Sequence, residues 1–185
     1  AKMANADAAF GFVPVRHMSG YAPRANKYTI GSGYATSIFN GDMVVLAADG
    51  EIEQAAATNT NNVGVFAGCS YTASDGSYVY SERWPASTTA TDIIAYVYDD
   101  PYIVYKVQST GTTAQTNIGN CADIVVGSGS TTTNQSAMEI SGTMAAGTAQ
   151  CKILALYDAP ENSFGADAVM EVLINEHVLK QTAGI

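Results

Sequence analysis

The sequence predicts an all-β fold, either a β-sandwich or a β-barrel, with an extended N-terminal arm and long polar loops. About ten short runs of apolar or alternating residues are separated by turn residues, as strands are in all-β proteins. Amphipathic helical periodicity is almost absent from the chain. Ser, Thr and Gly are frequent between the runs, which predicts loops that project from a framework of sheets.

The N-terminal segment, residues 1–27, is predicted to be an extended arm or an edge strand rather than a core element. Pro14 and Pro23 forbid a continuous helix here, and they remove backbone donors that a central strand needs. Strand signals dominate the rest of the chain. We therefore expect a single β domain over residues 28–185.

A first hairpin is predicted by turn chemistry. The apolar run 43–46 follows the turn residues Asn40-Gly41-Asp42, and Asp49-Gly50 then leads into a strand over 51–55. Residues of this kind tolerate the backbone angles of tight turns, so the two runs are expected to pair with each other.

The next run, residues 63–71, is apolar at nearly every position, as expected of a strand covered on both faces. Its glycines, Gly64 and Gly68, indicate close backbone approach or a bulge. A turn at 74–76 then leads into the alternating strand 78–84, which predicts one aromatic face that is wet at its edge.

Asp99-Asp100-Pro101 marks the clearest hairpin signal in the sequence. Pro fixes the φ angle of a turn, and the Asp side chains can bond their own backbone. The flanking strands over 93–98 and 102–107 are therefore predicted to pair.

The last part of the chain combines polar loops with short strands. Residues 109–150 predict loops with one short strand in each of the apolar islands 124–126 and 138–140. Strands are predicted over 151–157 and 168–174. Helix is the competing prediction for 166–180, but β-branched residues favour a strand there.

The charge of the chain excludes nucleic acid as a partner. Its 17 acidic and 8 basic side chains give a formal net charge of −9, which repels phosphate backbones. Charged residues are 14% of the chain, against about 25% in ordinary globular proteins. The surface is therefore expected to be polar without being strongly ionic.

The cysteines and the hydropathy pattern predict a protein made in a cytoplasm and without a membrane partner. Cys69, Cys121 and Cys151 are odd in number and scattered, which predicts reduced, buried thiols. No run approaches the roughly 18 apolar residues that cross a bilayer, and the first residues lack the apolar region of a secretory signal.

No catalytic or cofactor site is predicted. The chain has two histidines, His17 and His177, and lacks the short motifs of nucleophilic or phosphate-binding sites. His177 follows Glu176, but a structural or interface histidine is the commoner case. A hydrolase site built from His177, Asp158 and a serine has no supporting pattern in the sequence.

No metal site is predicted either. The acidic pairs Asp99/Asp100 and Glu51/Glu53 offer oxygen ligands of the kind that Ca²⁺ takes. They lack the spacing of a calcium-binding loop, so a turn and a solvated strand face are the preferred interpretations.

Six stretches of the chain carry a resemblance to a known family: AFGFVPVRH (9–17), YATSIFNGDMV (34–44), NVGVFAGC (62–69), WPA (84–86), AYVYDDP (95–101) and VLINEH (172–177). With these stretches the chain resembles the head decoration, or cement, proteins of tailed bacteriophages. The resemblance covers most of the chain except residues 109–150. It implies an all-β fold, trimeric or otherwise clustered packing on the capsid, and no catalysis.

A decoration role predicts a virion protein that is assembled in the host cytoplasm and binds the outer surface of the head. Its expected partner is the major capsid protein, whose subunits it bridges to stabilise the shell, and it is expected to be a homotrimer. The arm residues expected to contact the capsid or a neighbour are Phe12, Val13, Arg16, His17, Arg24 and Lys27. Because sheet edges need cover, exposed aromatic residues are expected at interfaces, namely Tyr78, Tyr80, Trp84 and Tyr102.

The alternative function is a surface adhesion or carbohydrate-binding β module, in a head fibre or tail component. Trp84 and the tyrosines can form a platform for sugar rings, because aromatic faces stack on them. Core or interface aromatics are the commoner case.

Overall fold

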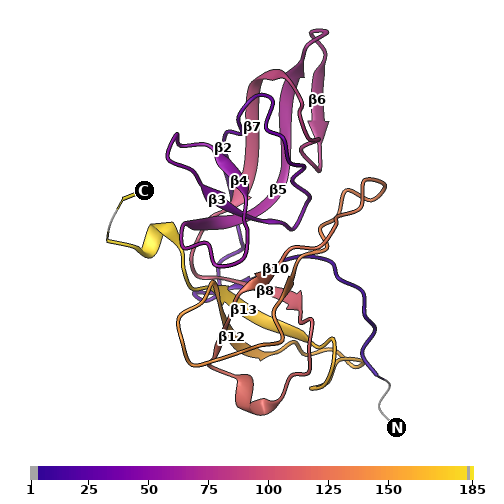
Figure 1. Cartoon of the computed structure of the whole chain (residues 1–185), viewed down its shortest axis with the longest axis vertical. Coiled ribbons are helices and arrows are strands. Elements are labelled where there is room, and N and C mark those ends of the chain that lie inside the picture. The colour runs from indigo at the N-terminus through magenta and orange to yellow at the C-terminus, as the bar shows by residue number, and fades with distance from the viewer. Residues whose placement is uncertain (1–3, 183) are drawn as a thin grey trace.

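The computed structural model describes residues 4–182 and 184–185, and it confirms the all-β prediction. Figure 1 shows two sheet regions, one above the other. Two short 3₁₀ segments, η1 (Gln115–Asn117) and η2 (Val178–Lys180), are present alongside the strands. The strands are β1 (Val13–His17), β2 (Ala25–Tyr28), β3 (Met43–Leu46), β4 (Ile52–Gln54), β5 (Asn62–Ala73), β6 (Tyr78–Ser81), β7 (Ala90–Tyr98), β8 (Ile103–Gln108), β9 (Cys121–Ala122), β10 (Ile124–Val125), β11 (Glu139–Ile140), β12 (Cys151–Leu156) and β13 (Val169–Ile174).

The strands form two main antiparallel sheets. The five-stranded sheet has the order β1-β8-β13-β12-β9, and the six-stranded sheet has the order β2-β7-β5-β3-β4, with β6 added to β5. A small third sheet pairs β10 with β11. No helix in the described part of the chain is long and apolar enough to cross a membrane.

The six-stranded sheet is buried on both faces over much of its area. Along β3, Met43 and Val45 contribute to one buried cluster and Val44 to another. We call the first cluster the shared core, because it also contains residues of the five-stranded sheet, and the second the outer core. Most of β5 is buried as well, so the prediction of a strand covered on both faces is confirmed.

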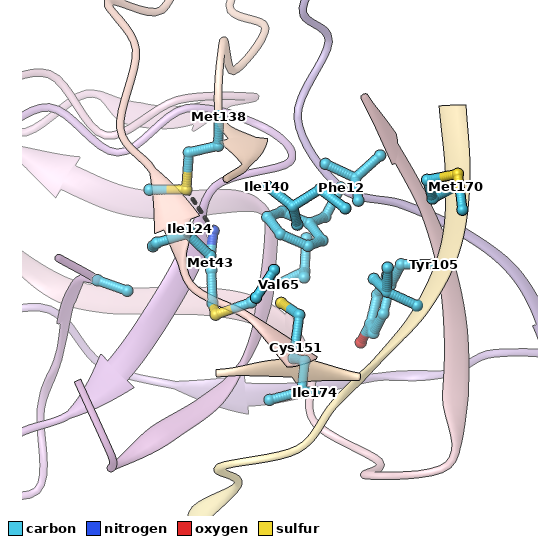
Figure 2. Close-up of a cluster of buried hydrophobic side chains, with 14 of the residues drawn as sticks. Phe12, Met43, Val65, Tyr105, Ile124, Met138, Ile140, Cys151, Met170 and Ile174 are labelled. Carbon is cyan, nitrogen blue, oxygen red and sulfur yellow. Dashed lines mark hydrogen bonds between the residues drawn. The ribbon is translucent and has the colours of Figure 1, made fainter. Parts of the chain in front are cut away.

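The shared core holds the two sheets together in the manner of a sandwich. Figure 2 shows Met43 and Val65 of the six-stranded sheet pointing toward Cys151 and Ile174 of the five-stranded sheet. Met138 closes the cluster from the polar loop region, and its Sδ atom accepts a hydrogen bond from the Met43 backbone N–H at 3.2 Å. Apolar surface from both sheets is therefore removed from water at one place.

A buried amide fastens the loop before β5 to the opposite sheet. Gln150 is 0% exposed, and its Nε2 donates to the Ala56 carbonyl and to Asn62 Oδ1, each at 3.0 Å. Its Oε1 accepts from the backbone N–H groups of Thr58 and Ile124, each at 3.1 Å. With two donors and two acceptor bonds used, the side chain meets its full hydrogen-bonding capacity without water.

Local turn predictions are confirmed for the first half of the chain. β3 and β4 pair as a hairpin, and Gly50 at their turn has φ 84°, in the region that favours glycine. β5 and β6 pair across the predicted 74–76 turn. The glycines of β5 also behave as predicted, because a Cβ on Gly64 would collide with the Tyr98 carbonyl oxygen, and a register shift occurs between Phe66 and Gly68.

The predicted hairpin around Asp99-Asp100-Pro101 is wrong. The turn and both strands exist, but β7 pairs with β2 and β5 while β8 pairs with β1 and β13. The turn therefore carries the chain from one sheet to the other. The turn residues determine that the chain reverses here, but not which strands then pair. Near this turn β7 is already paired with β2 on one edge and with β5 on the other, so β8 cannot pair with it there.

The N-terminal segment belongs to the sheets of its own chain. β1 is the edge strand of the five-stranded sheet and β2 is the edge strand of the six-stranded sheet, as the edge-strand alternative predicted. Phe12 is 1% exposed and lies in the shared core, where its ring meets that of Tyr105 edge to face at 6.2 Å. In this fold Phe12 cannot contact a capsid, because its side chain is already covered.

The second half of the chain follows the predicted pattern of loops and short strands. The islands at 124–126 and 138–140 supply β10 and β11, which pair with each other. β13 is a strand paired with β8 and β12, so strand rather than helix is confirmed for this segment. The three cysteines are free and buried, as predicted.

Phe12→Ala is expected to destabilise the fold by about 3 to 5 kcal/mol, because it removes a large side chain from the shared core and leaves a cavity. Urea unfolding measures the loss. Phe10→Ala is the matched control: Phe10 is only partly buried, two residues earlier, so its truncation is expected to cost clearly less. Equal losses for the two variants would contradict the placement of Phe12.

Candidate functional site

Three segments far apart in sequence meet on one exposed surface where the two sheets adjoin. The turn after β1 bonds to the turn before β8, since the Met18 N–H donates to the Tyr102 carbonyl at 3.0 Å. The C-terminal η2 joins them, with Lys180 Nζ 5.5 Å from the centroid of the Tyr102 ring. We call this area the junction surface and define it by Met18, Tyr21, Arg24, Tyr102, Leu179 and Lys180.

The junction surface exposes large apolar and aromatic side chains. Tyr21 is 75% exposed, and Met18, Tyr102 and Leu179 are each more than half exposed. A pocket of about 610 Å³ lies among them, lined by residues that include His17, Tyr21, Arg24, Pro101 and Leu179. Exposed aromatic and aliphatic side chains around a hollow are typical of a surface that binds a partner.

Polar contacts beneath this surface hold its turns in place. His17 Nε2 lies 3.0 Å from Asp100 Oδ2, and His17 Nδ1 accepts the Ser19 backbone N–H at 3.0 Å. Since Nδ1 accepts, Nε2 carries the proton and donates to the carboxylate. Burial raises the pKa of Asp100, but hydrogen bonds from the Tyr102 N–H and from His17 outweigh it, so the pKa lies below its ordinary value.

The neighbouring Asp99 is a structural acid. It is 8% exposed, and its two oxygens accept hydrogen bonds from Asn26 Nδ2 and the Tyr28 hydroxyl, each at 2.7 Å. Partial burial and then the hydrogen bond and charge of Asp99 raise the pKa of Tyr28. These bonds tie β2 to the turn between the sheets, so the junction surface is preorganised.

Basic residues gather around the junction surface although the chain is acidic. Of the eight Lys and Arg residues, Arg24 and Lys180 lie in it, and Arg16 and Lys27 lie beside it on β1 and β2. Arg16 is paired with Glu171 at 2.8 Å, while Arg24, Lys27 and Lys180 are exposed. The surface therefore presents positive side chains on a body whose net charge is −9.

The structure brings together only some of the site residues predicted from the sequence. His17, Arg24 and Tyr102 meet at the junction surface, with Arg16 and Lys27 in the strands beside it. Val13 is half-buried on β1. Tyr78 and Tyr80 are exposed, but they lie on β6, at the far end of the six-stranded sheet (Figure 1).

Trp84, predicted as an interface aromatic, is instead a core residue. It is 0% exposed in the outer core, and its ring meets that of Tyr71 at 5.3 Å. Sequence pattern alone does not separate an exposed Trp from a buried one. The junction residues Met18, Tyr21 and Leu179 were missed for a related reason, because no local pattern indicates that their segments meet.

For the residues considered for catalysis or metal binding, the described structure shows neither a metal-binding cluster nor a hydrogen bond between His177 and Asp158. Among the described residues, no group of three or more His, Cys, Asp or Glu side chains could hold a metal ion. His177 is 0% exposed, whereas Asp158 is exposed beyond the end of β12, and no hydrogen bond joins them. Burial raises the pKa of the Cys69 thiol to about 12, which keeps it protonated.

His177 stabilises the η2 segment of the junction surface through two hydrogen bonds. Its Nδ1 accepts the backbone N–H of Leu179 at 3.2 Å, and its carbonyl accepts the N–H of Lys180 at 2.9 Å. Its Nε2 is buried without a hydrogen-bond partner among the described residues. Burial, and then the charge of Lys180, lower the pKa of His177 to about 4, although Asp99 and Asp100 act in the opposite direction.

No family model, curated protein or solved structure matches this chain. The resemblance to phage decoration proteins therefore stays a prediction from the residues quoted above.

Acid is expected to destabilise the fold through His177. The unfolded chain takes up a proton near pH 6.5 and the folded chain only near pH 4, so stability falls as the pH drops between these values. The loss amounts to about 3 kcal/mol, the equivalent of the pKa difference. Urea unfolding at a series of pH values measures it.

His177→Asn serves as the control, because Asn keeps an acceptor for the Leu179 N–H but does not titrate. Its stability is expected to change less than that of the wild type between pH 6.5 and 4. Parallel curves for the two proteins would show that His177 is not the group responsible.

Proposed function

We propose that this chain is a head decoration (cement) protein of a tailed bacteriophage, which binds the outer capsid surface and bridges neighbouring major capsid protein subunits. The observation that carries the proposal is the junction surface, which joins exposed aromatic and apolar side chains to exposed basic groups. We infer the partner of this surface, the major capsid protein, from the resemblance of the chain to that family. In this role the protein performs no catalysis and is part of the virion.

The composition of the junction surface suits a protein partner. Tyr and Arg are enriched among the residues that dominate binding energy in protein interfaces. Tyr21, Tyr102 and Arg24 supply these types next to one pocket, in turns already fixed by the contacts of His17 and Asp99. A preorganised surface loses less entropy on binding, so more of its contact energy appears as affinity.

Charge favours a capsid surface with acidic groups. Arg24, Lys27 and Lys180 present positive charge, and the rest of the acidic chain repels nucleic acid. A homotrimer presents three such surfaces at once. Because the three surfaces are linked, binding of one raises the effective concentration of the other two at the capsid. Individually weak contacts therefore add up to firm attachment.

A double variant of the two junction tyrosines tests the proposal. Tyr21→Ala/Tyr102→Ala is expected to bind heads that lack the protein about tenfold or more weakly, because it removes two exposed anchor rings. Co-sedimentation with such heads measures binding. Both side chains are exposed, so unfolding curves are expected to match those of the wild type.

The matched control is Tyr78→Ala/Tyr80→Ala, which removes two tyrosines of similar exposure from β6. It is expected to bind heads as the wild type does. The proposal fails if both double variants bind equally well, or if native heads carry no copy of the chain.

A further inference from the structure

A second aromatic surface lies at the far end of the six-stranded sheet. Register pairs Tyr80 with Ser70, Tyr78 with Thr72 and Tyr96 with Gly68, so these side chains share one face. The opposite face carries Cys69, Tyr71 and Val79 and is covered by the outer core. We call the surface formed by Tyr78, Tyr80 and Tyr96 the tyrosine face.

Two of the three rings on the tyrosine face are open to solvent, and Tyr96 is half-buried beside Tyr80. Lower on the same face, Val65 and Tyr98 pack against the shared core, but Tyr78 and Tyr80 lie beyond the five-stranded sheet and are 69% and 64% exposed. Figure 1 shows β6 and the upper ends of β5 and β7 standing clear of the five-stranded sheet. Adjacent exposed rings beside an edge strand mark a candidate binding surface.

Two of the rings lie close together next to a glycine. The Tyr80 and Tyr96 ring centroids are 6.3 Å apart with an interplanar angle of 45°. A Cβ on Gly68, between the two strands that carry them, would lie 3.6 Å from the Tyr80 hydroxyl and 3.1 Å from the Ser81 carbonyl. The absence of a side chain there leaves a flat floor beneath the rings.

A polar pocket adjoins the lower end of the tyrosine face. The pocket has a volume of about 380 Å³. Two of its lining residues continue the strands of the tyrosine face, because Glu82 follows β6 and Tyr98 lies two residues beyond Tyr96 on β7. Asn40, Thr133 and Gln135 add amide and hydroxyl groups to its lining. Such a pocket offers both donors and acceptors to a ligand, beside rings that offer flat apolar contact.

The size of the tyrosine face favours a small ligand over a protein. The tyrosine face consists of three aromatic side chains. A stable protein interface involves about 20 to 30 residues on each partner. The face therefore matches a ligand of a few rings instead.

The charge of the site favours an uncharged ligand. Among the described residues that line the pocket, Glu82 is the one charged side chain, and the whole chain carries a net charge of −9. Anionic polymers are therefore repelled. Pyranose rings combine apolar C–H faces, which stack on aromatic rings, with hydroxyls that bond to amide and carboxylate groups.

We propose that the tyrosine face and the adjoining pocket bind a neutral oligosaccharide. Tyr80 and Tyr96 stack on successive sugar rings, and Glu82, Asn40 and Gln135 bond to the hydroxyls of a sugar seated in the pocket. The site is separate from the junction surface, so the same chain can hold a capsid through one surface and a glycan through the other.

An array of neutral oligosaccharides that includes maltohexaose, cellohexaose and chitohexaose tests the inference, with polygalacturonate as an anionic comparison. The full chain is expected to bind at least one neutral glycan and not the polyanion. Calorimetric titration with that glycan is expected to give about tenfold weaker binding for Tyr80→Ala and for Tyr96→Ala, since each loses a stacking ring.

Two control variants make the outcome specific. Tyr80→Phe keeps the ring and is expected to retain binding, and Tyr102→Ala, on the junction surface, is expected to bind the glycan as the wild type does. Binding to no neutral glycan, binding only to the polyanion, or binding that survives Tyr80→Ala would overturn the inference. None of these outcomes bears on capsid binding, which is measured with heads and different variants.

Discussion

The burial of β3 and β5 on both faces is the constraint on which the rest of the structure depends. Alternate residues of β3 enter the shared core and the outer core, so these central strands require cover from two sides. The five-stranded sheet covers one side, and the segment carrying Ile30 and Ile38, with Trp84, covers the other. The chain therefore needs neither a disulfide nor, among its described residues, a metal cluster to fasten its two sheets.

Both candidate surfaces follow from the limited overlap of the two sheets. Where the sheets adjoin, the chain crosses between them at Asp99 and Asp100, and the turns of three segments collect into the junction surface. Where the six-stranded sheet extends past its partner, one of its faces stays open and displays Tyr78 and Tyr80. A full overlap of the sheets would have buried those two rings and removed that surface.

The two surfaces differ in chemistry in a way that suits different partners. The junction surface joins aromatic and aliphatic side chains to Arg24 and Lys180, in turns held by buried polar contacts, which is the chemistry of a protein interface. The tyrosine face is small and made of three aromatic rings, and a polar pocket lies at its end. Under the function we propose, the junction surface would hold the capsid and the tyrosine face would remain open to a ligand.

The sequence alone determined the fold class, most of the strands and the turns, because alternation, β-branched residues and Gly, Asp and Pro act within a few residues of chain. It also selected His17, Arg24 and Tyr102, which the structure brings together at the junction surface. Tertiary structure decided which strands pair, and so the 99–101 turn became a crossover between sheets instead of a hairpin. It also buried Phe12 and Trp84 and brought Tyr21 and Leu179 together, since burial and long-range contact depend on partners that no local pattern names.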